Sequence, residues 1–537
     1  MVIVELLLIT AAVGIFASAK SYQPILAGGL MLLVIAWSVR FGYDRRVLRP
    51  TKLDWPLRLF LVSGLISLWA SYNFDTSLAK FCLIVGSIAL YYALNQAPLK
   101  IRLNIGIGLI VFAAALALYF ITQENEIAAI GAGKFPLLTN LHATLRSVSP
   151  QLNLYQPHPN LVAGVLEIGL IIGVGVTLAH YQAWPPSRRA TRQSSNQTPS
   201  PFLVPLILCL GLIALGLLLT GSRGAWLAVA GAGLGWFFVE MQHTSRLRLL
   251  DSLALLIILG SIIFFLFLQI NGPAQASTTE DPSSVSRLTI YRGSSHLIRD
   301  YIFTGAGLGS FPMLYSAYVL EIDVVKQNHP HNLYLSVWLE QGLLGILALL
   351  WLTIAYISTY FGWRKIQEFP PKTNQAQAQR LLAAASFWTT IVFFAHGLID
   401  SVHYNSRFLP LVFVVLGLGG FTTLVKAKPE DMPIRQAAQP RNLVIAGVVA
   451  GVVALLLWLW PPARASWYAN LGAVEQSKIE LSDYAWPDRI PSKVRPTADL
   501  SGPIQLFESA LKLAPENATA TERLDLIKQS SNQSSAN

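Results

Sequence analysis

Histidine side chains gather in one short stretch of this chain, at the boundary between a loop and a long apolar run. The stretch is Asn328-His-Pro-His-Asn332, and it contributes His329, His331 and Asn332. An imidazole has an ordinary pKa near 6.5, so it can take a hydroxyl proton at neutral pH. Either histidine could therefore serve as a general base, although a histidine in this place also suits an anchor at a membrane interface.

Arginines stand in two settings that suit an anionic ligand. Arg223 lies in the tight turn Thr220-Gly-Ser-Arg-Gly224, where the glycines allow close backbone approach. A guanidinium group binds phosphate oxygens in a bidentate manner, so this turn could hold a diphosphate. The alternative is an arginine that extends to phospholipid headgroups.

The second setting is a helix expected from residue 286 onward. At about 100° per residue, Arg292 and Arg299 share one face, while Arg287 falls in the apolar sector of the other. A charge on a packed face needs a partner. We therefore expect Arg287 to face the ligand, and the Arg292 face to meet headgroups or solvent.

Composition places these groups in a membrane protein. Of 537 residues, 53% are hydrophobic and 12% charged, against roughly 25% charged in a soluble domain. Apolar runs of about 18 residues recur, each long enough to cross a hydrocarbon core of about 30 Å as a helix. The net charge of +11 fits loops rich in Lys and Arg, and no basic stripe interleaved with aromatics suggests nucleic acid.

The pattern predicts an all-α polytopic integral membrane protein with about thirteen transmembrane helices. The expected spans are 2–19, 23–40, 56–73, 80–96, 104–122, 161–180, 202–219, 225–241, 251–270, 333–360, 381–403, 408–425 and 443–460. Loops rich in Lys and Arg alternate with loops that lack them. By the positive-inside rule, the N-terminus is cytoplasmic, and the loops that hold Arg223 and His331 lie outside.

Polar residues of several spans share one level near the outer surface. Ionisable groups inside a bilayer are costly, so their position is informative. The residues at or just above this level are Glu167, Glu340, His396, Asp400, Asn160 and Arg223. We expect a polar chamber that opens outward, although each residue could instead make a separate helix–helix contact.

Several of these motifs together resemble one family. His331-Asn332, nine further residues and then Gly342-x-x-Gly345 resemble the signature of the O-antigen ligases and related polysaccharide polymerases. The last family position, usually Gly, Thr or Tyr, is Ile346 here. The segment 219–226 looks like the family's Ser-Arg-Gly turn before a span.

Two further segments carry the same resemblance. Ser286 to Phe311 looks like the family's Arg-bearing periplasmic helix and its Gly-x-Gly-x-Gly turn, and Gln156 to Ala163, which includes His158, looks like the start of a central span. The glycines follow a helix and lack Lys-Ser/Thr, so we do not expect a nucleotide loop. The resemblance covers roughly residues 120–420.

The resemblance implies a GT-C-like membrane enzyme with four regions. These are N-terminal transmembrane helices at 1–122, a catalytic O-antigen ligase-like domain at 123–425 with a periplasmic loop at 271–332, a last span at 426–460, and an extracytoplasmic tail at 461–537. The tail forms a small helical extension. Part of it resembles a tetratricopeptide-type hairpin, and one such unit cannot bury its own face.

The implied reaction is transfer of a glycan from undecaprenyl diphosphate to an acceptor hydroxyl. His331 becomes the best general-base candidate, with His329 still a competitor, and Arg223 and Arg287 bind the diphosphate. The expected supporting or substrate-binding residues are His329, Asn332, Asn160, His158, Glu167, Glu340, Arg292, His396 and Asp400. No carboxylate pair stands on the outer loops, so we expect a metal-independent reaction without a cofactor. A single displacement would invert the anomeric centre.

The expected partners are the lipid-linked donor, a glycolipid, polysaccharide or protein acceptor, and the lipid bilayer, without nucleic acid. The expected location is the bacterial cytoplasmic membrane with the active site facing the periplasm or exterior. Two alternatives remain. One is a transporter of a small anion such as bicarbonate, for which polar groups near the midplane and repeated broken helices would be expected. The other is a non-catalytic scaffold that uses the tail for interactions.

Overall fold

A computed structural model describes residues 1–18, 23–46, 48–123, 136–150, 157–183, 203–241, 282–367, 371, 373–422 and 458–536. Within these ranges the regular elements are helices, apart from one isolated bridge between Ala485 and Arg489. The predicted all-α class is confirmed for this part of the chain.

Several helices are long and apolar enough to cross a membrane. Among the described residues, six meet that description by length and composition: α2 (Gln23–Asp44), α4 (Phe74–Asn95), α5 (Leu99–Gln123), α8 (Pro159–Ala183), α14 (Leu333–Lys365) and α15 (Asn374–His396). Shorter apolar helices are α1 (Val2–Ser18), α9 (Leu203–Leu219), α10 (Arg223–Met241) and α16 (Leu409–Leu418). The protein is a helical membrane protein, and the expected number of thirteen spans stays a prediction. The expected span 251–270 and most of 443–460 lie outside the described residues.

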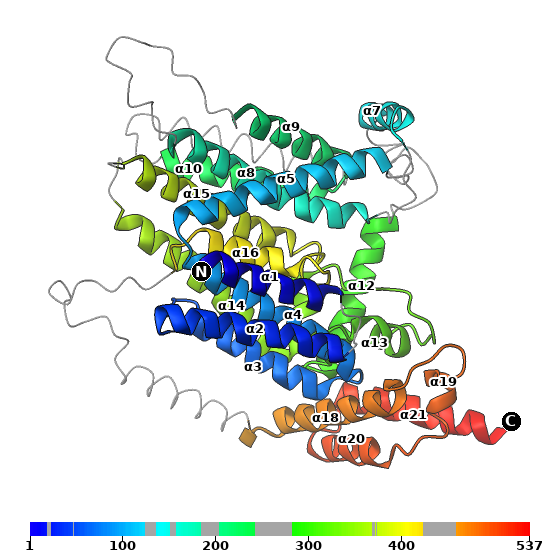
Figure 1. Ribbon diagram of the computed structural model, residues 1–537. Coiled ribbons are helices and arrows are strands. Elements are labelled where there is room, and N and C mark those ends of the chain that lie inside the picture. Colours follow the sequence, from blue (N-terminus) through cyan, green and yellow to red (C-terminus); the bar gives the residue numbers. More distant parts are fainter. Residues whose placement is uncertain are drawn as a thin grey trace, which may run out of the picture.

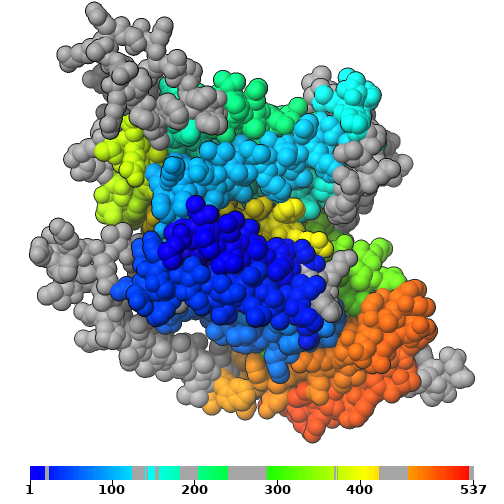
Figure 2. All heavy atoms as spheres, in the orientation of Figure 1, coloured from blue at the N-terminus to red at the C-terminus, as the bar shows by residue number. Residues whose placement is uncertain are grey.

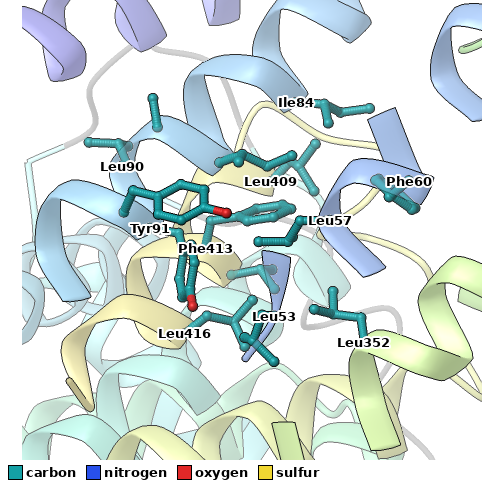
Figure 3. Packing of buried hydrophobic residues seen from close by; sticks show 14 of the residues in the cluster. Leu53, Leu57, Phe60, Ile84, Leu90, Tyr91, Leu352, Leu409, Phe413 and Leu416 are labelled. Carbon is teal, nitrogen blue, oxygen red and sulfur yellow. The ribbon is translucent and has the colours of Figure 1, made fainter. Parts of the chain in front are cut away.

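The described helices form two packed groups (Figure 1). In one group, α1, α2, α3 (Asp54–Ala70) and α4 pack with α14 and α16 around a core that contains Tyr91, Leu57 and Phe413 (Figure 3). In the other, α5, α8, α9 and α10 pack together with α15. Contacts between α15 and α16 join the two groups, so the segment between these helices lies at their junction.

That junction corrects one predicted span. The span expected at 381–403 is wrong at its end, because α15 stops at His396 and residues 397–408 form turns before α16. Gly397 caps α15, and the Asp400 carboxylate accepts the N–H of Ser401 at 2.7 Å. Polar side chains in this segment bond to their own backbone and to neighbouring helices, which favours turns over a continued helix. The span expected at 408–425 is likewise shorter, because α16 ends at Leu418.

A second correction concerns the span expected as one piece at 333–360. The helix α14 breaks at Gly342, whose φ of 66° and ψ of −165° are not helical. The turn after α12 (Pro282–Asp300) fills the break: the N–H of Ala306 donates to Leu339 O at 2.8 Å, and the N–H of Leu343 donates to Ile302 O at 2.8 Å. A Cβ atom at Gly305 would lie 2.3 Å from Glu340 O. The glycine-rich turn therefore supplies backbone hydrogen bonds that α14 lacks where it breaks.

The C-terminal tail is more extensive than the sequence suggested. It contains α18 (Pro461–Leu481), α19 (Pro491–Val494), α20 (Ser501–Leu513) and α21 (Ala518–Ala536). The first of these was not predicted, and it packs along α20 around Phe507. The tail shares a hydrophobic core with α12 and α13 (Phe311–Tyr318), so the face that a lone hairpin would expose is covered. Figure 2 shows the tail, in orange and red, against one end of the bundle, where Lys478 Nζ lies 4.7 Å from the Trp69 ring of α3.

Candidate functional site

The site centres on His331 and Asp400, which lie 69 residues apart in the sequence. His331 Nδ1 is 3.4 Å from Asp400 Oδ2, and the Asp400 side chain is only 2% exposed. The next residue, Asn332, caps α14 by accepting the N–H groups of Tyr334 and Leu335, so the loop enters the helix at a fixed angle. The hydroxyl of Tyr291 on α12 donates to His331 O at 2.9 Å. Asn332, predicted as a supporting residue, thus positions His331 through the helix cap.

Donor and cationic groups surround Asp400. Its Oδ2 accepts from Asn160 Nδ2 at 2.9 Å and lies 4.0 Å from a guanidinium nitrogen of Arg287. Burial by itself would raise the pKa of Asp400, but the hydrogen bond with His331 and the charges of nearby histidines hold this pKa well below its ordinary range. Asp400 is therefore ionised at neutral pH. With Nδ1 of His331 next to this carboxylate, Nε2 is the nitrogen that can accept a proton.

The structure distinguishes the two histidines of the motif. The rings of His329 and His331 are 4.2 Å apart and nearly edge to face. Burial and the charge of His331 lower the pKa of His329 to about 4. Its Nδ1 faces the Ser401 hydroxyl at 3.5 Å rather than a carboxylate. A histidine with so low a pKa is a weak proton acceptor, which favours His331 as the base.

A network of polar side chains from α4 and α14 contacts the 397–408 segment next to the site. Glu340, in the first half of α14, forms a buried ion pair with Lys80 of α4 at 2.7 Å. Lys80 also donates to Asn405 Oδ1 at 3.1 Å, and Asn405 Nδ2 donates to Ser401 Oγ at 2.9 Å. Glu340 therefore acts on the site through its neighbours. The sequence argument missed Lys80, although a charged residue at the start of an expected span, level with Glu340, was a usable signal.

A second buried carboxylate brings two more histidines together. Glu167 of α8 is fully buried, and its Oε2 lies 2.9 Å from His396 Nδ1 at the end of α15. His403, which the sequence argument did not single out, lies 3.7 Å from Glu167 and donates from Nε2 to Gly164 O at 2.7 Å. Glu167 and His396 were expected to lie at one level of the bundle. They meet, together with His403, in one buried polar cluster between α8, α15 and the 397–408 segment.

The arginine turn lies next to this cluster. Arg223 is the first residue of α10, and a Cβ atom at the following Gly224 would lie 3.2 Å from the His396 ring. Close packing of the turn against His396 explains the glycine there. His158 is exposed, and its Nδ1 accepts the N–H of Asn160 at 3.2 Å, which orders the start of α8.

Arg287 and Arg292 lie in different surroundings on α12, as their spacing predicted, whereas Arg299 does not lie where it was expected. Arg287 is partly buried beside Asp400, whereas Arg292 is exposed, so the structure does not bring Arg292 to the Asp400 cluster. Arg299, expected to meet headgroups or solvent, instead pairs with Glu522 of the tail. Leu288, next to Arg287, is 52% exposed, so the apolar face of α12 is not packed along its whole length.

A cavity of about 870 Å³ adjoins the site. Its polar lining comes from Lys80, His158, Asn328, His329 and Arg407, among others. Its apolar lining includes Phe16 and Leu83 from α1 and α4, with Leu161 and Phe408 opposite. A ligand with both a polar and an apolar part fits such walls.

The described residues contain one group that could hold a metal ion. His329, His331 and Asp400 each offer a ligand atom, and these atoms lie within 4.8 Å of one another. Two imidazoles and one carboxylate suit a zinc-type ion. The sequence did not predict this group, because Asp400 fell inside the expected span 381–403 rather than on an outer loop. Asp400 already faces Asn160, His331 and Arg287, so the carboxylate has partners without a metal.

Comparison with known proteins points to one family. The family model described as O-antigen ligase matches residues 208–350, a segment that contains Arg223, Arg287 and His331. Together with the helical membrane fold, this match makes the segment similar to a family of membrane enzymes of the glycosyltransferase or ligase type. The resemblance inferred from the motifs is confirmed, and the chain is O-antigen ligase-like over this segment. No curated protein matches the chain.

Proposed function

We propose that the protein transfers a glycan from undecaprenyl diphosphate to an acceptor hydroxyl, on the outer side of the bacterial cytoplasmic membrane. The observation that carries the proposal is the pairing of His331 with the buried, ionised Asp400, beside the Arg287 guanidinium. A base held by a carboxylate, next to a group that binds phosphate, is what attack on a sugar diphosphate requires.

In the proposed reaction, Nε2 of His331 takes the proton of the acceptor hydroxyl. The acceptor oxygen forms a bond to the anomeric carbon of the glycan, and the bond from that carbon to the diphosphate oxygen breaks. Undecaprenyl diphosphate leaves with the electron pair. A single displacement of this kind inverts the anomeric centre.

Two groups of charges stabilise the transition state. Asp400 stabilises the imidazolium that forms on His331, since its carboxylate lies 3.4 Å from Nδ1. Arg287, and Arg223 in its turn, neutralise the charge that grows on the leaving diphosphate. No step in this scheme needs a metal ion or a cofactor.

The proposal covers three activities that share these residues: ligation of a glycan to a glycolipid, polymerisation of a polysaccharide, and transfer to a protein hydroxyl. The mixed lining of the 870 Å³ cavity accommodates an acceptor that carries both sugar and lipid. Transport of a small anion, the alternative from sequence, gains no support from the comparison, because the matched family is a ligase family.

The experiment that tests the proposal uses purified protein, undecaprenyl-diphosphate-linked glycan and acceptor. His331→Ala should lower turnover by about 10²-fold or more, because general-base assistance is felt only in the transition state. Binding of the donor should stay near the wild-type value. His296→Ala is the matched control, since His296 is an exposed histidine on α12, and it should retain full turnover.

Two other results would move the proposal. If His331→Ala transfers normally while His329→Ala does not, the base is the other imidazole. If both variants fold, insert and transfer at wild-type rates, glycan transfer by this site is wrong.

A further inference from the structure

The C-terminal tail lies outside the matched family segment, yet it contacts α12, the turn after α12 and the loop that leads to the histidines. Its first contact is with Asp300 at the end of α12. The Asp300 carboxylate accepts from Arg523 Nε at 3.0 Å and Nη2 at 2.8 Å, and from the Thr519 hydroxyl at 2.8 Å. The Arg523 side chain is 4% exposed and lies 3.6 Å from the Tyr318 ring of α13. The end of α12 is thus fixed to α21 by a buried ion pair, in which two guanidinium nitrogens donate to the same carboxylate oxygen, Oδ2.

The second contact fixes the turn that follows α12. Asn470 of α18 accepts the N–H of Phe303 at 2.9 Å and the N–H of Thr304 at 3.3 Å. Its amide nitrogen donates to the Thr304 hydroxyl at 2.8 Å. These residues directly precede the glycine turn that fills the break in α14. The tail therefore fixes this turn as well as α12.

The third contact fixes the loop that leads to the histidines. The Asp323 carboxylate accepts from the Ser492 hydroxyl at 2.7 Å and from the Ser492 N–H at 3.1 Å. The Tyr484 hydroxyl donates to Asp323 O at 2.8 Å. Asp323 lies in the same loop as His329 and His331, so the tail restrains that loop at a point six residues before His329.

We infer that the tail is a positioning element of the active site, which sets the Arg287 helix and the His331 loop relative to each other. This inference rests on the proposed function. The helix α12 carries Arg287 near its start and Asp300 at its end, and a helix that is fixed at one end has its direction set along its length. A buried ion pair contributes little net stability but can specify one geometry.

The effect on the reaction follows from the tolerance of catalytic geometry. A displacement of about 1 Å can lower a rate by about 10²-fold when the reacting groups must be aligned. Loosening the tail should therefore lower kcat and leave the KM of the acceptor nearly unchanged, because the tail residues named here do not line the 870 Å³ cavity.

The test compares Arg523→Ala with Arg489→Ala in the full-length protein. Arg489 is an exposed tail arginine paired with Asp483, so its loss controls for a general effect on the tail. Arg523→Ala should lower kcat about tenfold or more, Arg523→Lys should recover part of the loss, and Arg489→Ala should match wild type. Spin labels at Ser295 on α12 and Ile354 on α14, after replacement of Cys82 and Cys209, should give a broader distance distribution in Arg523→Ala only.

A milder variant covers the case in which Arg523→Ala does not fold. Ser492→Ala with Tyr484→Phe removes two hydroxyl hydrogen bonds to Asp323 in the histidine loop, keeps the Ser492 N–H bond to the Asp323 carboxylate, and should lower kcat about threefold. If this double variant, or a folded Arg523→Ala, keeps the wild-type kcat and label distances, the tail does not position the site. Failure of the proposed function would give a different result. His331→Ala would then be active, while the label distances in Arg523→Ala would still show whether the tail holds α12 in place.

Discussion

Two buried carboxylates at the same end of the bundle, Glu340 and Asp400, have different kinds of partner. Glu340 is paired with Lys80 through both oxygens, at 3.0 and 2.7 Å, and Lys80 is in turn held by Asn405. Asp400 faces an imidazole at 3.4 Å and a guanidinium at 4.0 Å, both on partly exposed side chains. Both oxygens of Glu340 are occupied by Lys80, which also lines the 870 Å³ cavity. The partners of Asp400, His331 and Arg287, stay partly exposed and able to reach a substrate.

The variant Asp400→Asn should show most clearly that the two carboxylates have different roles. The amide cannot stabilise an imidazolium on His331, so turnover should fall by about 10²-fold or more with donor binding retained. Glu340→Gln at the same depth should cost mainly stability. The comparison needs turnover per folded molecule for both variants. Equal losses of turnover at equal stability would remove the distinction between a reactive and a supporting carboxylate.

Arg223→Ala should produce the next largest effect, and it concerns binding. The diphosphate charge exists before the reaction, so this variant should weaken binding of undecaprenyl diphosphate by about tenfold, besides slowing transfer. Arg223→Lys should restore little if the contact is bidentate. Binding to the detergent-purified protein measures this directly, and unchanged affinity in Arg223→Ala would assign the diphosphate to other residues.

The pair of Lys80 and Glu340 gives a smaller effect on turnover. Lys80→Met or Glu340→Met alone leaves one buried charge without its partner, a change worth about 3–5 kcal/mol of stability. The double variant Lys80→Met/Glu340→Met should recover most of that loss and keep turnover within about tenfold of wild type. Lys80 is linked to the segment of Asp400 only through Asn405, and it forms only one part of the cavity wall. Thermal unfolding of the three variants tests this. A double variant that is stable but inactive would place Lys80 or Glu340 in direct contact with substrate.

Removal of metal should have the smallest effect. Although His329, His331 and Asp400 could hold an ion, Asp400 already has an amide, an imidazole and a guanidinium around it. Turnover should therefore be unchanged in EDTA. Loss of turnover that Zn²⁺ or Mg²⁺ restores would contradict the mechanism, and would assign these three residues to a catalytic metal instead.

Hydrophobic runs are local signals and predicted the helical membrane class, and helical periodicity separated Arg287 from Arg292. The glycine-rich turn after α12 was expected from the resemblance to the family. Sequence alone could not predict the contact between His331 and Asp400, which depends on where α15 ends. That end is set by hydrogen bonds of the 397–408 segment with α4, α8 and α14, and such partners are invisible in a local pattern. Lys80 stands at the start of an expected span, level with Glu340, but the sequence alone did not show that these two side chains meet.

The break at Gly342 also bears on how the protein assembles. The peptide groups of Leu339 and Leu343 are satisfied by the turn at residues 302–307 rather than by α14 itself. In a bilayer, unpaired peptide groups at this depth cost several kcal/mol each. We therefore expect α14 to enter the membrane as two half-helices that become a stable unit only when the preceding loop folds back onto them, so that the site forms late and as a whole during biogenesis.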